Sequence, residues 1–175
     1  MLSESARVTT AAESRFRVRT PNAQPRAVAV VALDDATAAL AAELAGRAWR
    51  GTTFFTAPAE AAPDRSVPAG SFSRWLRTIT GQAIDLADEV ARVDAVQMLL
   101  TAGQDAPAGS LIGDACLLQG VKTSGLVIDD PGPDGHGADA AALSRSLRAL
   151  RPWVMTLSVI SSAEYVDDIL HALGG

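Results

Sequence analysis

The stretch AVAVVALDD, residues 27–35, decides the fold, because seven consecutive apolar residues are followed there by two aspartates. A short valine-rich run is typical of a strand that is buried on both faces of a parallel sheet. Asp35 is expected to cap a helix over residues 36–49, in which Leu40 and Leu44 share one face. A strand followed at once by a helix predicts a βαβ unit, with helices covering the sheet.

The same alternation of strand and helix continues along the chain. Further strands are predicted at residues 52–56, 94–101, 122–129 and 153–160, and further helices at residues 72–93, 108–119, 139–150 and 161–174. We therefore predict an α/β protein with a three-layer Rossmann-like fold, a five-stranded, mainly parallel sheet and helices on both faces. Residues 27–175 are expected to form its single domain. Residues 1–26 are expected to form a flexible N-terminal tail or a short edge strand at residues 16–19.

The longest of these helices, residues 72–93, is predicted from apolar residues spaced alternately four and three apart. They are Phe72, Leu76, Ile79, Ala83, Leu86, Val90 and Val93. We expect this seam to pack on the sheet, the other use being a partner helix in a dimer. Trp75 lies beside the seam, so we expect it at the interface of a homodimer or beneath the proline-rich loop of residues 57–70.

Composition bears on partners, location and cofactors. The formal net charge of −5 disfavours a nucleic-acid-binding surface. No apolar run reaches the length of a membrane span, and the N-terminus lacks the apolar core of a signal peptide, so we expect a cytoplasmic protein without a membrane partner. Cys116 is the single cysteine, which rules out an internal disulfide and favours a core residue over a nucleophile. We expect neither a cofactor nor a metal.

The expected ligand site is the edge of the sheet beyond the carboxyl ends of its strands, where open α/β sheets bind ligands. The candidate ligand-binding residues there are Asp34, Asp35, Thr56, Thr101, Gly103, Gly109, Ser110 and Asp129. Neither GxGxxG nor GxxxxGK[ST] is present, and two carboxylates after the first strand would repel a phosphate. The alternative for these two acids is that Asp35 caps the helix and Asp34 is a solvated neighbour.

An acidic loop follows the fourth predicted strand. Its possible ligands for a divalent ion are Asp129, Asp130, Asp134, His136 and Asp139. Their spacing fits no calcium-loop pattern, so a flexible acidic surface loop is the favoured interpretation. No Ser/His/Asp or Cys/His set can be assembled, and no catalytic residue is assigned.

Residues 45–56, AGRAWRGTTFFT, resemble the passage from the first helix to the second strand in the FtsZ/tubulin GTPase family. Residues 94–129 are similar to that family's third strand, phosphate loop, helix and fourth strand. The resemblance spans residues 27–130 and implies a related Rossmann-like fold. The family's first glycine-rich loop is replaced by LDDATAAL, and its GGGTG-type signature by GQDAPAGS, where Pro107 lacks an N–H donor. The resemblance therefore implies neither GTP hydrolysis nor filament formation.

Two functions remain open at this point, and the sequence does not decide whether the protein is an enzyme. The first is a non-catalytic Rossmann-like α/β module that acts through self-association, as a homodimer, or through a protein partner. The alternative is a small-ligand or nucleotide-binding protein, or an enzyme, that uses the carboxyl edge of the strands. A deep pocket at that edge would favour the second function, and an edge filled by side chains would favour the first.

Overall fold

β1 (Val28–Ala32) is the central strand of the sheet, and all five of its residues are buried. The structure, a computed structural model, describes residues 26–57, 75–131 and 137–174. Val28 pairs with Thr52 of one neighbouring strand and with Ala95 of the other, both in parallel. A strand with a parallel neighbour on each edge and a helix layer on each face must be apolar throughout, which is why these residues are valines and alanines.

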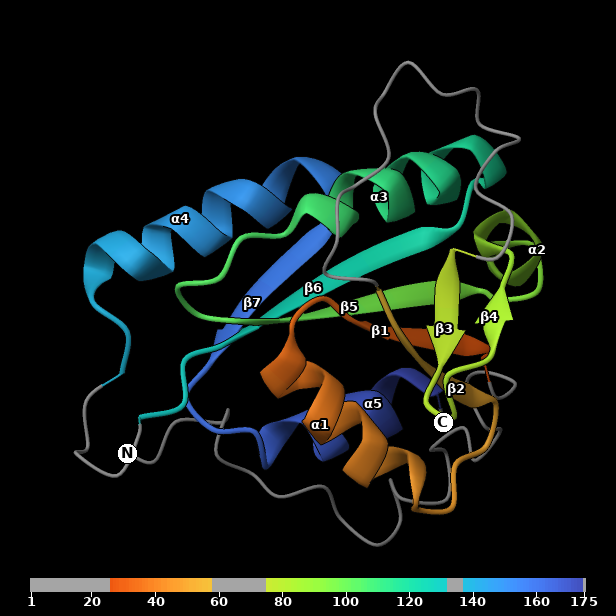
Figure 1. Ribbon diagram of the computed structural model, residues 1–175, viewed down its shortest axis with the longest axis horizontal. Coiled ribbons are helices and arrows are strands. Elements are labelled where there is room, and N and C mark those ends of the chain that lie inside the picture. The colour runs from red at the N-terminus through yellow and green to blue at the C-terminus, as the bar shows by residue number, and fades with distance from the viewer. Residues whose placement is uncertain (1–25, 58–74, 132–136, 175) are drawn as a thin grey trace, which may run out of the picture.

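Within the described residues the sheet has seven strands, in the order β4-β3-β2-β1-β5-β6-β7 (Figure 1). The remaining strands are β2 (Thr52–Thr56), β3 (Leu76–Thr78), β4 (Ala83–Ile84), β5 (Ala95–Thr101), β6 (Lys122–Ile128) and β7 (Thr156–Ile160). The five strands β2, β1, β5, β6 and β7 are parallel, as predicted, whereas β3 and β4 pair antiparallel. The protein is therefore α/β with a mixed sheet, and the predicted count of five strands was wrong.

The predicted helix over residues 72–93 was also wrong in the part that the structure describes. Its place is taken by the β3–β4 hairpin and by the short helix α2 (Leu86–Val90). Gly81 adopts a φ of 85° in the hairpin turn, where its N–H donates to the carbonyl of Thr78 over 2.8 Å. Asp85 then starts α2 by accepting hydrogen bonds from the N–H groups of Ala87 and Asp88. A positive φ ends any regular helix, and a fresh N-cap begins a new one.

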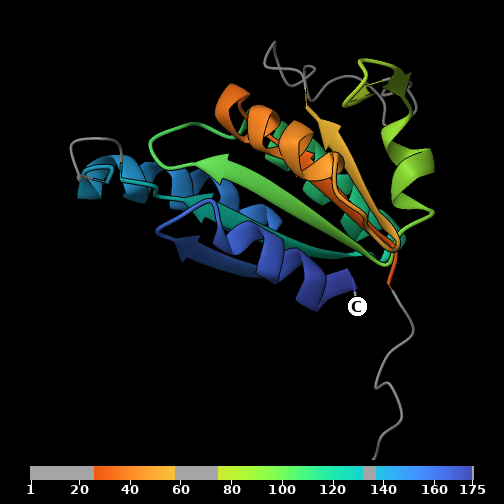
Figure 2. The same cartoon turned by 90° about the horizontal axis from the view of Figure 1, so that it is seen from below.

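Helices cover both faces of the sheet (Figures 1 and 2). The longer helices are α1 (Asp35–Ala45), α3 (Pro107–Gln119), α4 (Ala140–Leu150) and α5 (Tyr165–Gly174). α1 and α5 lie on one face, where Leu44 and Leu170 are buried against strand residues such as Val30. α3 and α4 lie on the other, where Ile112 and Leu150 are buried. Alternate side chains of each central strand thus enter two separate cores.

Leu150, at the end of α4, fills a socket between α3 and the sheet. A Cβ on Gly109 of α3 would lie 3.3 Å from one methyl of Leu150, and a Cβ on Gly125 of β6 would lie 2.7 Å from the other. Leu150 has no exposed surface. Two positions without side chains therefore create the space that one leucine occupies.

A 3₁₀ turn, Arg151–Trp153, leads from α4 towards β7 and packs on α3. A Cβ on Gly113 would lie 2.8 Å from the Cβ of Trp153 and 3.0 Å from its carbonyl oxygen. Glycine inside a helix costs about 1 kcal/mol relative to alanine, and here it permits this close approach. Within the described residues, no helix combines the length and apolarity that crossing a bilayer requires.

Candidate functional site

Asp34 joins the carboxyl ends of the two central strands β1 and β5. Its Oδ2 accepts from the N–H of Thr101 at 2.7 Å, and its Oδ1 accepts from the hydroxyl of Thr101 at 2.9 Å. Oδ1 also accepts from the N–H of Thr37 at 3.0 Å. In return, the hydroxyl oxygen of Thr37 accepts from the N–H of Asp34 at 3.2 Å. Asp34, and not Asp35 as predicted, is therefore the N-cap of α1, while Asp35 is exposed in the first turn.

This bridge lies at the point where the sheet would receive a ligand. The helices that follow β1 and β5 lie on opposite faces, so the carboxyl ends of these two strands flank a crevice in folds of this type. Both carboxylate oxygens of Asp34 and both polar groups of Thr101 on that side are already paired with each other. A ligand entering there would have to replace bonds that the chain makes with itself.

Asp129 and Asp130, which follow β6, likewise accept hydrogen bonds from N–H groups of the chain. Asp129 accepts from the N–H of Ala138 at 2.6 Å, and a Cβ on Gly137 would lie 2.7 Å from its carboxylate. Asp130 accepts from the N–H of Ala163 at 3.3 Å. Asp139 caps α4 through the N–H of Ala142.

The acidic loop is described in part, since Asp134 and His136 lie outside the described residues. Among the residues that are described, no group of three or more His, Cys, Asp or Glu side chains is placed to hold a metal ion.

Gly103 and Thr56 both lie at strand ends. The N–H of Gly103 donates to the hydroxyl of the buried Ser146 at 2.9 Å, and that hydroxyl donates to the carbonyl of Gln104. Gly103 has a φ of 91°, which explains why glycine is found in this turn. Thr56 ends β2 opposite Arg77 of β3.

Gly109 and Ser110 are inside α3, whose first residue is Pro107. The stretch GQDAPAGS is thus a turn followed by the first helical turn, in agreement with the helix predicted over residues 108–119. Gly109 packs on Leu150, and the hydroxyl of Ser110 donates to the carbonyl of Pro107 at 3.1 Å. Pro107 is accommodated because the first helical N–H has no helical partner to lose.

An apolar groove of about 310 Å³ lies at the opposite, amino end of β6 and β7. It runs between the end of α3 and the residues that lead into β7, and its apolar lining includes Leu117, Val121, Pro152, Trp153 and Met155. Leu117 and Met155 are 79% and 73% exposed. Large apolar side chains gathered in one exposed place are typical of a surface that another protein covers. We call these five residues the α3–β7 groove.

β7 is the edge strand beside that groove and is paired with β6 alone among the described strands (Figure 2). Its sequence, TLSVI, contains no charge and no proline, and Val159 is 44% exposed. The opposite edge is the two-residue strand β4. Soluble proteins protect edge strands by shortening them or by adding charge or proline. β4 is protected in this way by its length, and β7 is not.

Cys116 lies at the floor of the groove and has no exposed surface. Burial raises the pKa of its thiol to about 12. Because the thiolate is the reactive form, a pKa this high describes an inert core cysteine, in agreement with the favoured interpretation of the sequence.

We expect Cys116 of the native protein to react with an aromatic disulfide reagent at pH 8 at least about 1000-fold more slowly than in the unfolded chain. The factor follows from the thiolate fractions at a pKa of about 12 and at the ordinary value of a cysteine. The absorbance of the released thiolate measures both rates, with the same protein in denaturant as the control. Equal rates would show that the thiol is accessible and ionisable in the folded state.

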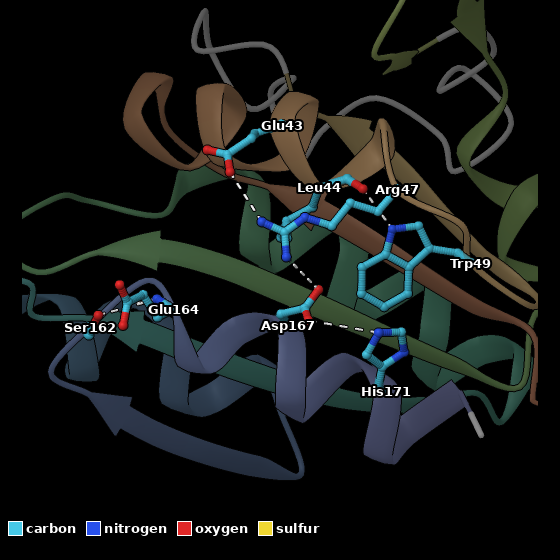
Figure 3. Close-up of polar contacts among 8 residues, drawn as sticks. All are labelled: Glu43, Leu44, Arg47, Trp49, Ser162, Glu164, Asp167 and His171. Carbon is cyan, nitrogen blue, oxygen red and sulfur yellow. Dashed lines mark hydrogen bonds and ion pairs between the residues drawn. The ribbon is translucent and has the colours of Figure 1, made fainter.

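A polar cluster joins α1 to α5 on the other face of the sheet (Figure 3). Arg47 lies between Glu43, at 3.1 Å, and Asp167, at 2.9 Å, the second contact being an ion pair without the angle of a hydrogen bond. His171 stacks on Trp49 with ring centroids 4.5 Å apart. The indole N–H of Trp49 donates to the carbonyl of Leu44 at 2.7 Å, in the last turn of α1.

Sequence reasoning missed this cluster, because its members come from opposite ends of the chain. Each of its charged or ring groups has a neighbour within the protein, so the cluster fastens α5 onto α1. Arg47 is about half exposed, and exposed ion pairs of this kind contribute about 0.2–1 kcal/mol.

Comparison with protein families finds no match, and comparison with curated proteins finds none either. Among solved structures, the chain is similar to the conserved hypothetical protein BatB from Bacteroides thetaiotaomicron. The identity is 7%, the alignment covers 83% of this chain and 97% of that chain, and the TM-score is 0.35. A TM-score this low carries no argument about function, which therefore rests on the geometry alone.

Proposed function

We propose that this protein is a non-catalytic α/β module, Rossmann-like in its parallel strands, that acts by associating with itself. The five parallel strands support the Rossmann-like assignment, since numbered along the chain they run 2-1-3-4-5, an order typical of doubly wound sheets. The hairpin β3–β4 is then an addition at one edge of that sheet.

The observation that carries the proposal is the unprotected edge strand β7 beside the exposed α3–β7 groove. A five-residue neutral edge offers backbone N–H and C=O groups to another strand, and the groove adjoining it offers apolar area. Together they provide directional hydrogen bonding and a hydrophobic contribution at one place on the surface. Symmetric dimers are the commonest assemblies of soluble proteins, so self-association is the simplest use of such a surface.

The alternative function, ligand binding at the carboxyl edge, has less support. The acids and hydroxyl groups expected to bind a ligand there are Asp34, Thr101 and Asp129, and each is hydrogen-bonded within the chain. The exposed apolar groove lies at the other end of the strands. A carboxyl edge occupied by side chains that bind one another is the result expected for a module that acts by association.

Sedimentation velocity at micromolar concentrations of the full chain tests the proposal. We expect a reversible dimer that dissociates on dilution. The double variant Leu117→Asp/Met155→Asp should weaken it, because it places charge on the exposed apolar groove. Ala42→Asp, on the exposed side of α1, is the matched control and should leave the dimer intact. A wild-type monomer over the whole concentration range would refute self-association.

A further inference from the structure

Among the described residues, the backbone groups of β7 that are not directed at β6 belong to Leu157 and Val159. The N–H of Asp129, at the end of β6, donates to the carbonyl of Ile160 at 2.8 Å, so Ile160 faces β6. Backbone N–H and C=O groups alternate between the two sides of a strand, which places those of Ser158 and Thr156 towards β6 as well. Leu157 and Val159 therefore direct their N–H and C=O groups away from the sheet.

We infer that the partner at this edge is a second copy of the chain, whose β7 pairs antiparallel with β7 about a two-fold axis at Ser158. This inference rests on the proposed self-association and adds its location and register. In this register Leu157 lies opposite Val159 of the partner subunit, and the two residues exchange both of their backbone hydrogen bonds. This register pairs the outward-facing groups of both residues in both copies, and it is compatible with two-fold symmetry.

The side chains agree with this register. Leu157 and Val159 lie on the α3/α4 face of β7, since they pair with Gly125 and Val127 of β6 and Val127 belongs to that core. Each leucine would therefore meet a valine of the partner subunit on the same face. Cross-strand pairs of apolar and β-branched residues are a main source of stability between antiparallel strands.

The charges around β7 favour a copy in the antiparallel direction. Arg151 precedes the strand, while Asp130 and Glu164 lie close to its end, Asp130 being tied there by its bond to Ala163. An antiparallel pair brings the basic end of one strand next to the acidic end of the other, whereas a parallel pair would bring like charges together.

A hollow of about 270 Å³ adjoins the basic end of β7 and is lined by Arg151, Val154, Met155 and Leu157. In the proposed register Met155 lies opposite Ser161 of the partner subunit, so the polar residues that follow β7 in one copy would enter this hollow in the other. The hollow therefore provides space, and the positive charge of Arg151, for the residues that follow β7 in the partner subunit.

Oxidative cross-linking of Ser158→Cys tests the register directly. At the two-fold axis residue 158 faces its own counterpart, in a non-hydrogen-bonded pair with Cα atoms about 4.5 Å apart, so a covalent dimer should form under mild oxidation. Ser161→Cys is the control, because the same register separates its two copies by six residues, roughly 20 Å. Native Cys116 is buried and should not interfere.

Val159→Lys provides a second test that needs no disulfide. A lysine on the α3/α4 face of the edge strand, opposite Leu157 of the partner subunit, should raise the dimer dissociation constant by about 100-fold, whereas Val159→Thr should change it little. Far-ultraviolet circular dichroism checks that both variants keep the fold. A dimer that persists in Val159→Lys, with no cross-link in Ser158→Cys, would overturn the β7 pairing and leave self-association through another surface.

A wild-type monomer would overturn both this inference and the proposed function. A dimer of the full chain that cross-links at residue 158 and dissociates in Val159→Lys supports the inference in full.

Discussion

Replacing Asp34 by alanine is expected to lower the free energy of unfolding by about 2–4 kcal/mol. The variant loses the N-cap of α1, worth about 0.5–2 kcal/mol. It also leaves the N–H and hydroxyl of Thr101 without their acceptor at the junction of β1 and β5. An unsatisfied buried donor costs about 1–3 kcal/mol. These part-buried groups should cost the lower part of that range, so the two losses together exceed that of an ordinary cap.

Urea unfolding followed by tryptophan fluorescence measures this effect, and two variants give the controls. Asp34→Asn retains an oxygen for Thr37 but places an NH₂ group against the N–H of Thr101, so its loss should be intermediate. Asp35→Ala, exposed in the same helical turn, should change stability by about 0.3–1 kcal/mol at most. If Asp34→Ala proved as stable as the wild type, the carboxylate would be available to a ligand, and the alternative function would regain support.

Replacing Leu150 by alanine is the second large effect, with an expected loss of about 2–5 kcal/mol. Leu150 is fully buried where α3, α4 and β6 meet, and the glycines around it cannot expand to fill the vacated space. Leu118→Ala is the matched control, because Leu118 is 77% exposed and its truncation removes no core contact. Chemical denaturation with both variants separates the effect of burial from that of leucine itself.

A double-mutant cycle with Gly125→Ala tests the socket specifically. Alone, Gly125→Ala should destabilise, because its Cβ would lie 2.7 Å from a methyl of Leu150. Combined with Leu150→Ala, the same Cβ should occupy part of the cavity and recover stability. Additive losses would show that the two positions do not share one space.

The parallel core of the sheet could be predicted because its signals are local. Each of its strands is rich in apolar or β-branched residues, and β1 was predicted at residues 27–33 against an observed Val28–Ala32. The β3–β4 hairpin was missed because Leu76, Leu86 and Val90 reproduce a helical spacing although Leu76 belongs to β3 and the other two belong to α2. All three are buried, so the apolar spacing identified buried residues correctly but predicted the wrong secondary structure for them.

The predicted dimer contact through Trp75 depended on that helix and loses its basis with it. Trp75 instead precedes β3 and is partly buried against the core on the α3/α4 face. The proline-rich loop that was its other expected neighbour lies almost wholly outside the described residues. The homodimer itself stays a prediction, now placed at β7.

The candidate site could be predicted in position but not in role. Asp34, Thr101 and Asp129 do lie at strand ends, yet their hydrogen-bond partners depend on strand order, which no local pattern contains. Gly109 was predicted as a candidate ligand-binding residue, whereas its lack of a side chain makes room for Leu150. The exposed edge was equally hidden, since the order of the strands, which places β7 at the margin of the sheet, is not contained in its sequence.

The central position of β1 has a consequence for synthesis of the chain. β1 emerges from the ribosome early, but β5, its partner on one side, ends at Thr101. At 5–20 residues per second this leaves roughly 3–14 s during which five valines and alanines lack that neighbour. Exposed apolar residues of this kind are prone to aggregation during that interval, and the end of β5 marks the length at which the chain can first fold around its own centre.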